Sequence, residues 1–305
     1  MHAKNSEMPK KNRFPIVMLV LATIIWGSTF AVVKDTMNSV NEYYLIFMRS
    51  IIAALPLLAL TLFKNPKSLF NKEIIKKGAI IGVALGLSYG FQNLGMIYTS
   101  AGNSAFIMAS NVIFVPIFLV LFYKNRLNGK SIISILIVVF GLGLLTYKDG
   151  TELNPGDFLT LMSAAITALH IIWTGRFVKN SDLLALVTYQ FLFAALLAFV
   201  ASIFMSPESF TANYSPESWT AMIYLGLLGS LFCYFITVWA QKYVDYVTVT
   251  LIFSLEPVFA AVFSFYFIGE ILGHQQLFGA SLILFGILFF EIPFDRVINR
   301  SNEKL

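Results

Sequence analysis

Charge is what this sequence has least of. Only 12% of its 305 residues are charged, whereas 58% are hydrophobic, and the mean hydropathy is +0.77. A soluble domain carries roughly 25% charged residues, so this chain has about half the charge that a water-facing surface needs. A soluble enzyme is therefore excluded, and so is disorder, because the apolar surface is too large to stay solvated. Lipid must be the solvent for most of the chain.

Cysteine and the motifs of metal and nucleotide chemistry are also scarce. The single cysteine, Cys233, lies inside a hydrophobic run, which excludes a disulfide framework and a cysteine metal site. The three histidines, His2, His170 and His274, are far apart and form no HExxH motif. No GxxxxGK[ST] loop for nucleotide phosphates is present. No two carboxylates are expected at the same depth of the helix bundle, where a catalytic pair would have to lie. We therefore predict no cofactor, no metal and no catalytic residues, with an intramembrane enzyme as the less favoured alternative.

Long hydrophobic runs are abundant. A membrane-spanning helix needs about 20 apolar residues, and continuous runs indicate helices because a barrel strand alternates in polarity. The first run is too long for a cleaved signal peptide and lacks a small-residue cleavage site, so we expect it to be retained. We predict an all-α integral membrane protein with ten transmembrane helices. The runs are 14–33, 43–63, 78–98, 103–123, 131–147, 156–175, 183–205, 219–240, 246–268 and 273–294.

The positive charges predict the orientation. If the N-terminus is cytoplasmic, 18 of the 21 lysines and arginines fall on the cytoplasmic side. Lys34 and Lys148 fall on the other side, and Arg49 lies within the second run. Cytoplasmic loops of membrane proteins carry this excess, so we predict a multi-pass protein of the cytoplasmic (inner) membrane with both termini cytoplasmic. The net charge of +5 thus reflects topology, and we expect no nucleic-acid partner.

An internal repeat divides the chain into halves. An offset of 145 residues aligns Tyr89 with Tyr234, and an offset of 141 aligns Arg49 with Gln190. Each half holds five helices, an odd number, so the second half must enter the membrane from the opposite side. We predict two inverted repeats over 14–148 and 156–294, flanked by cytoplasmic tails 1–13 and 295–305. Inverted repeats are typical of secondary transporters, whose site near the midplane opens alternately to each side.

A resemblance to a known family rests on short motifs in both halves. Residues 254–261 read SLEPVFAA, 268–270 read IGE and 282–286 read LILFG, while the first half has WGSTF at 26–30. With Arg49 and Pro116, this pattern resembles the EamA family of the drug/metabolite transporter superfamily. The resemblance implies a ten-helix fold with a central cavity and the export of amino acids or other small metabolites. Asn111 and Asn125 occupy the repeat positions of Glu256 and Glu270, so any role of a glutamate is confined to the second half.

Three charged residues are candidates for coupling or gating. Charge within a membrane costs about 2.5–3.5 kcal/mol at a helix centre, which makes Arg49 and Glu256 functional candidates. Arg49 has an alternative role in joining two helices, and Glu256 an alternative role in capping the backbone groups that Pro257 leaves unpaired. Glu270, at the end of its run, is predicted to make a structural or gating contact near the external surface.

Polar and aromatic side chains supply candidates for substrate binding. Tyr89, Gln92 and Asn93 share one helix face, which must turn inward because amides in lipid lack partners; contact between helices is the alternative. His170 is the one histidine within a run, with proton relay and packing as the two interpretations. Aromatic rings combine apolar area with attraction for cations. The candidate substrate-binding residues are Trp26, Ser28, Phe30, Tyr89, Gln92, Asn93, Asn111, His170, Trp173, Tyr234 and Trp239.

These observations predict a secondary transporter that moves a small polar or amphipathic metabolite, such as an amino acid, by alternating access. A channel or facilitator for small solutes is the alternative. The expected partners are a small-molecule substrate, membrane lipid and protons as a candidate coupling ion. The oligomeric state is left open.

Overall fold

A computed structural model describes residues 14–123, 129–146, 154–241, 243–244, 252–253 and 255–291, and within these residues the chain is helical with no strand. The predicted tails 1–13 and 295–305 lie outside the described residues, as do 147–148, 246–251 and 292–294. The α-helices are α1 (Phe14–Thr36), α2 (Glu42–Lys64), α3 (Lys72–Tyr98), α4 (Ala101–Ala109), α5 (Asn111–Tyr123), α6 (Gly129–Thr146), α7 (Pro155–Phe177), α8 (Leu183–Met205), α9 (Pro216–Tyr224), α10 (Cys233–Ala240), α12 (Glu256–Ile268) and α13 (His274–Glu291).

The prediction of an all-helical membrane protein is confirmed. In the described part of the chain, seven helical stretches are long and apolar enough to cross a membrane. Three shorter apolar helices, Ile132–Leu145, Glu256–Ile268 and His274–Phe289, fall on the fifth, ninth and tenth predicted runs. The ninth predicted run begins among residues that the structure does not describe.

Two of the predicted runs contain an irregular turn. The fourth run breaks at Ser110 between α4 and α5, where the Ser110 hydroxyl donates to the Ile107 carbonyl at 2.6 Å. The eighth run passes from α9 to α10 through a π-helix, η4 (Leu225–Phe232). Such irregular turns leave backbone groups that other elements must satisfy, and they are tolerated at membrane depth where they are buried in protein.

Polar residues set the helix starts. The side chains of Asn41, Asn71, Ser100, Asn154 and Asp182 each accept a hydrogen bond from a backbone N–H in the first turn of the helix that follows. These bonds satisfy N–H groups that have no partner within the helix. The short connections of the bundle therefore encode where each helix begins.

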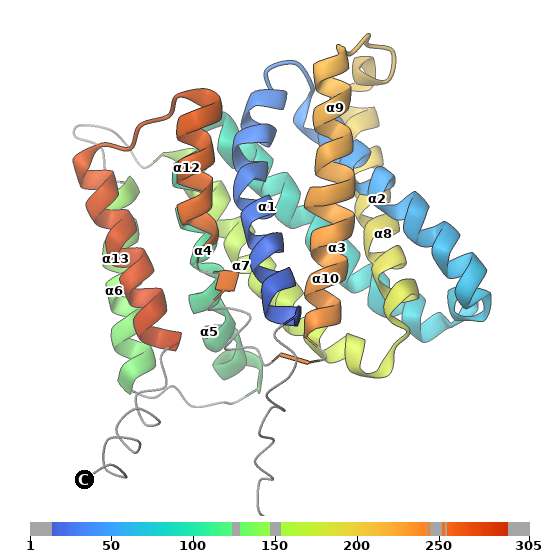
Figure 1. Cartoon of the computed structure of the whole chain (residues 1–305), viewed down its shortest axis with the longest axis horizontal. Coiled ribbons are helices and arrows are strands. Elements are labelled where there is room, and N and C mark those ends of the chain that lie inside the picture. The colour runs from blue at the N-terminus through green and yellow to red at the C-terminus, as the bar shows by residue number, and fades with distance from the viewer. Residues whose placement is uncertain are drawn as a thin grey trace, which may run out of the picture.

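The bundle has two margins and a centre (Figure 1). The pair α6 and α13 lies at one margin, while α2, α3 and α8 pack together at the other. Between them, α1 contacts α10 and α12, and α7 contacts α3, α4 and α5. Glycine allows the closest approaches: a Cβ on Gly82 of α3 would lie 2.5 Å from the Gln190 carbonyl oxygen of α8. Backbones this close exclude any larger side chain.

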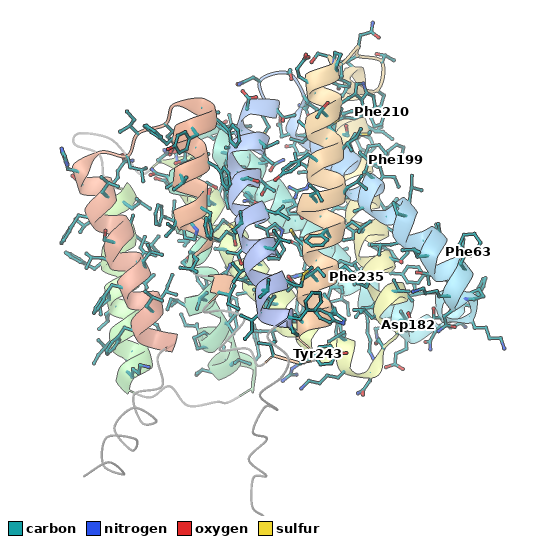
Figure 2. All side chains as sticks on the ribbon, viewed as in Figure 1. Phe63, Asp182, Phe199, Phe210, Phe235 and Tyr243 are labelled. Atoms are coloured by element: carbon teal, nitrogen blue, oxygen red, sulfur yellow. The ribbon has the colours of Figure 1, made fainter. Side chains whose placement is uncertain are left out.

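The surface of the bundle is apolar and its interior contains polar groups. Phe63 projects from α2 at the margin of the molecule (Figure 2) and is 88% exposed. Arg49, Asn93, His170 and Gln190 are buried instead. This arrangement suits a lipid environment, in which polar groups find partners only in the interior.

Candidate functional site

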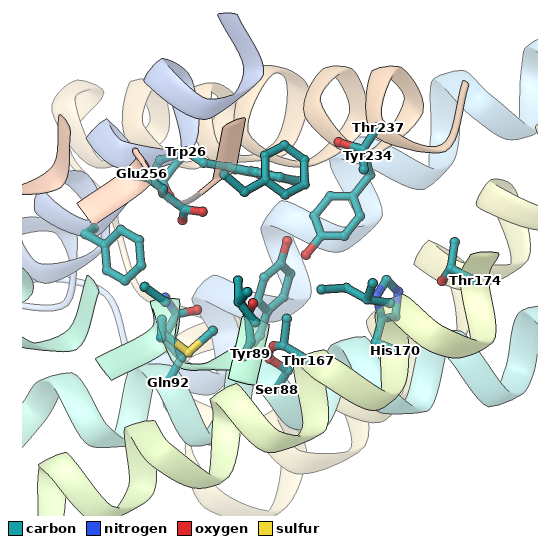
Figure 3. Close-up of a pocket in the computed structure, with 18 of the residues that line it drawn as sticks. Trp26, Ser88, Tyr89, Gln92, Thr167, His170, Thr174, Tyr234, Thr237 and Glu256 are labelled. Atoms are coloured by element: carbon teal, nitrogen blue, oxygen red, sulfur yellow. Dashed lines mark hydrogen bonds between the residues drawn. The ribbon is translucent and has the colours of Figure 1, made fainter. Parts of the chain in front are cut away.

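A cavity lies among the central helices, with about 1060 Å³ of space free of protein atoms, part of it open to the outside. Its wall is built by α1, α2, α3, α4, α5, α7, α10 and α12 (Figure 3). The cavity runs from the middle of α1 toward the end of the bundle where α7 and α10 finish. Its lining residues are Trp26, Thr29, Phe30, Arg49, Ser88, Tyr89, Gln92, Met108, Ala109, Asn111, Val112, Thr167, His170, Ile171, Thr174, Tyr234, Thr237, Val238, Gln241, Phe253 and Glu256.

Trp26 forms a fixed aromatic wall. Its indole Nε1 donates to the Gly229 carbonyl in η4 at 2.9 Å. The indole also makes edge contacts with Tyr234 and Phe253, with ring centres 5.2 and 5.1 Å apart. Because the indole donor is satisfied by the backbone, the ring offers a ligand its apolar and π surface rather than a hydrogen bond.

The neighbouring glycine brings α12 against α1. A Cβ on Gly27 would lie 2.5 Å from the Phe259 Cβ and 3.1 Å from the Glu256 carbonyl oxygen. Only glycine allows this contact, which sets the first turn of α12 beside Trp26. Trp26 thus supplies the aromatic wall, and Gly27 leaves the space for the first turn of α12, which begins at Glu256.

Arg49 is the cation of the cavity. It is 3% exposed, and its guanidinium carbon lies 4.0 Å from the centre of the Tyr89 ring. Its Nε donates to the Ser230 hydroxyl of η4 at 3.1 Å. Stacking on an aromatic face and one hydrogen bond compensate in part for desolvation of the charge. The terminal guanidinium nitrogens make no hydrogen bond among the described residues, so they remain available to an anionic group of a ligand.

Glu256 is the carboxylate of the cavity. Figure 3 shows its carboxyl group beside Trp26 and directed into the open space. In the part of the chain that the structure describes, Glu256 receives no hydrogen bond and forms no ion pair. A carboxyl group in this environment needs either a proton or a cationic partner, because an isolated buried charge is costly.

His170 lies on the opposite side of the cavity. Its Nε2 is 3.2 Å from Oε1 of Gln190, which is fully buried, and its ring makes an edge contact with Tyr234 at 5.9 Å between centres. The Tyr234 and Tyr89 hydroxyl groups point toward each other in Figure 3. This cluster adds an imidazole and two phenol groups to the cavity wall.

The structure brings nine of the predicted site residues together at the cavity and places five elsewhere. Ser28 bonds to the Tyr224 hydroxyl at 2.5 Å, because it faces α9. Asn93 donates to the Glu42 carbonyl at 3.4 Å, and Trp173 packs against the core between α2 and α8. Trp239 contacts Phe14 and Tyr243 at the end of the bundle, and Glu270 lies at the opposite end. The nine that line the cavity are Trp26, Phe30, Arg49, Tyr89, Gln92, Asn111, His170, Tyr234 and Glu256.

Several lining residues were not among the predicted site residues. Ser88, Thr174, Gln241 and Phe253 line the cavity, and the first three are polar. They follow helical spacing from predicted residues: Ser88 is four before Gln92, and Thr174 is four after His170. A search for polar stripes along each helix would have found them, whereas Phe253 carries no signal that separates it from a lipid-facing residue.

The fold and the cavity define an integral membrane protein with an interior polar site. The chain belongs to the EamA-like transporter family, whose model matches residues 13–147 and 154–291. It is 31% identical over 278 residues to an uncharacterized transporter of Archaeoglobus fulgidus, covering 90% of this chain and 84% of that protein. It is 26% identical to the uncharacterized transporter YyaM of Bacillus subtilis, covering 89% and 92% of the two chains.

A solved crystal structure has the same fold. It matches with a TM-score of 0.65 at 16% identity and covers 89% of this chain and 94% of that one. The family match and the relatives named as transporters support a membrane transporter, and the family implies a small-molecule substrate.

Proposed function

We propose that the protein is a secondary transporter that moves a small polar or amphipathic metabolite, such as an amino acid, across the cytoplasmic membrane. The observation that carries this proposal is the cavity with Arg49 and Glu256 on its wall. One cation and one carboxylate within an aromatic enclosure complement a small molecule that carries both charges and an apolar part. Gln92, Asn111 and His170 would hydrogen-bond its polar groups.

The contacts between helices support alternating access by two inverted halves. In the repeat, α7 corresponds to α1, and α4 with α5 corresponds to α12. The contact of α1 with α12 therefore has its counterpart in the contact of α7 with α4 and α5. The contacts of α1 with α10 and of α2 with η4 likewise correspond to those of α7 with α3 and of α8 with α3. Halves that exchange contacts in this way can adopt two related states of similar energy, which alternating access requires.

The cations support a cytoplasmic location for both termini. Lys64, Lys72, Lys76, Arg176 and Lys179 lie at or beyond helix ends that are predicted to be cytoplasmic. Positive residues near helix ends remain on the cytoplasmic side during insertion. On this orientation the cavity extends toward the cytoplasm, and export is the direction that the family resemblance favours.

Glu256 is the proposed site at which a proton and a substrate cation compete. A protonated carboxyl would be neutral in the empty cavity, and a cationic substrate would replace the proton. Glu256→Gln keeps the size of the side chain and removes its charge, so proton-dependent uptake into proteoliposomes should be abolished. Retained proton coupling in this variant would overturn the assignment.

A ligand screen tests the function itself. Purified protein is heated with amino acids, nucleotides, sugars and cofactors, because a ligand that binds the native state raises the unfolding temperature. We expect a hit among amphipathic zwitterions, lost on Gln92→Leu, followed by saturable transport in proteoliposomes. Ion flux that continues at rates beyond those of a carrier would instead identify a channel.

A further inference from the structure

The connection between α3 and α4, residues 99–100, is held at the end of the bundle away from the cavity. At this end α1, α3 and α12 finish and α4 and α7 begin. Lys34 is eight residues beyond Trp26 on α1, which corresponds to roughly 12 Å along the helix. The held connection is therefore separate from the cavity residues described above.

Lys34 binds the end of α3. Its ammonium group donates to the carbonyl oxygens of Met96 and Thr99, the latter at 3.1 Å. The last carbonyl groups of a helix have no partner within the helix and carry partial negative charge. The cation thus complements the end of α3.

Glu270 binds the start of α4. Its two carboxylate oxygens accept from the Gly102 backbone N–H at 3.0 and 3.2 Å. The start of a helix carries partial positive charge, so the carboxylate complements it as Lys34 complements the end of α3. A Cβ on Gly102 would lie 2.7 Å from Glu270 Oε1, so glycine is needed for this approach. Among the described residues Lys34 and Glu270 form no ion pair with each other, and each bonds to backbone groups at or beside the connection.

The second half of the chain supplies further bonds to the same connection. Asp157, in the first turn of α7, accepts from the Thr99 hydroxyl at 2.5 Å, and Asn154 donates to the Tyr98 carbonyl at 3.1 Å. A buried apolar cluster, which includes Val33, Met96, Ala105 and Ala260, extends from the connection to Phe30 on the cavity wall. The bonds from Asn154, Asp157 and Glu270 therefore join the two halves beside a buried apolar cluster.

We propose that Lys34 and Glu270, with Asp157, form a latch on the α3–α4 connection that keeps this end of the bundle closed while the cavity faces the other end. These bonds must break before the cavity can open at the end where the latch lies. Glu270 and Asp157 belong to the second half of the chain, whereas the connection belongs to the first. This inference rests on the proposed alternating access. On the predicted orientation, the latch closes the external side.

Accessibility of a single cysteine from each side of the membrane tests the latch. In a Cys233→Ala background, Met108→Cys places a thiol on the cavity wall, and a membrane-impermeant maleimide is added to sealed vesicles of each orientation. With the latch intact, the thiol should react mainly from the cavity end. Glu270→Ala and Lys34→Met should each raise the rate from the latch end about tenfold, since each removes charge-assisted bonds that the closed state alone makes.

Three controls make the outcome decisive. Glu73→Gln breaks the ion pair between the exposed Glu73 and Lys77 at the opposite end of α3 and should leave the labelling rates unchanged. If Glu270→Ala folds poorly, Glu270→Gln takes its place. Glutamine keeps the side-chain volume but removes the charge, so the labelling rate from the latch end should rise by a smaller factor. Ser50→Cys, fully buried outside the cavity, should stay unreactive in every variant. The latch would be overturned if the latch variants left the rate of labelling from the latch end unchanged. It would also be overturned if Glu73→Gln raised that rate equally, or if the thiol of Ser50→Cys became reactive as well.

The labelling result is independent of transport. If the rates do not respond but the chain transports, the latch fails and the proposed function stands. If the labelling rates rise as expected but no ligand binds or is transported, the proposed function fails, whereas the latch on the α3–α4 connection stands.

Discussion

The guanidinium group of Arg49 stacks on the ring of Tyr89, with 4.0 Å between the guanidinium carbon and the ring centre. This contact joins α2 to α3 at the wall of the cavity. It holds the buried guanidinium group against the ring while Arg49 still lines the cavity. The stability of the bundle and the proposed ligand site therefore depend on the same pair of side chains.

We expect Arg49 and Tyr89 to be energetically coupled. A double-mutant cycle with Arg49→Met and Tyr89→Leu should give a coupling of about 1–2 kcal/mol, since a desolvated cation–π contact is worth that much. The free energies of unfolding are measured by denaturant titration in mixed micelles. Ser230→Ala, which removes the Nε acceptor alone, should cost about 1 kcal/mol. Additive single effects of Arg49 and Tyr89 would show that the stacking contributes nothing.

Gly27 should tolerate no side chain. Gly27→Ala would set a Cβ 2.5 Å from the Phe259 Cβ, and forcing α12 away from α1 should destabilise the protein by about 1–3 kcal/mol. Gly90→Ala is the matched control, because a Cβ there has no neighbour within 4 Å and alanine favours the helix. Thermal unfolding of the two variants provides the comparison, and equal unfolding temperatures would contradict the packing argument.

His170 and Gln190 should behave as one hydrogen-bonded unit. Gln190→Leu leaves a buried imidazole without its partner and should cost about 1–3 kcal/mol. Adding His170→Leu removes the second polar group, so the double variant should lose less than the sum of the single losses. Denaturant titration of the four proteins measures the difference. A double variant that loses the full sum would show that the two side chains act separately.

Trp26 should be more sensitive to substitution than an exterior tryptophan. Trp26→Phe removes the donor to the Gly229 carbonyl and should cost about 1 kcal/mol in unfolding free energy. It should also weaken binding of any ligand found in the screen, because the aromatic wall becomes smaller and less fixed. Trp219→Phe is the control, since Trp219 is 41% exposed and lies outside the cavity. Equal losses of binding in both variants would count against the aromatic wall.

Much of the fold follows from local sequence properties. The length of the apolar runs determines that they cross a membrane as helices, because backbone groups in lipid must bond within the helix. Capping residues such as Asn71 and Asp182 mark helix starts in the sequence. The family resemblance, confirmed by the match to the EamA-like model, also rested on short motifs. The irregular turns at Ser110 and in η4 were not predicted, because the hydrophobic pattern runs through both without a change.

The site was predictable only in part. Arg49 and Glu256 stood out because charge within an apolar run is costly, and both line the cavity. Asn93 and Gln92 are adjacent in sequence and chemically alike, yet Gln92 faces the cavity and Asn93 binds the backbone of α2. A rotation of about 100° between successive helical residues separates them, and only the neighbouring helices decide which direction is interior.

The sequence by itself determined that this protein is a helical membrane protein with very few interior charges, because hydrophobicity and charge act along the chain without regard to tertiary contacts, and its motifs indicated a transporter family. The tertiary structure alone decided which of the polar residues meet. It set Arg49 on Tyr89, left Glu256 facing the cavity, and placed Lys34 and Glu270 on the α3–α4 connection. These relations join residues far apart in the chain, so they depend on how the helices pack, including the close approaches at Gly27 and Gly102.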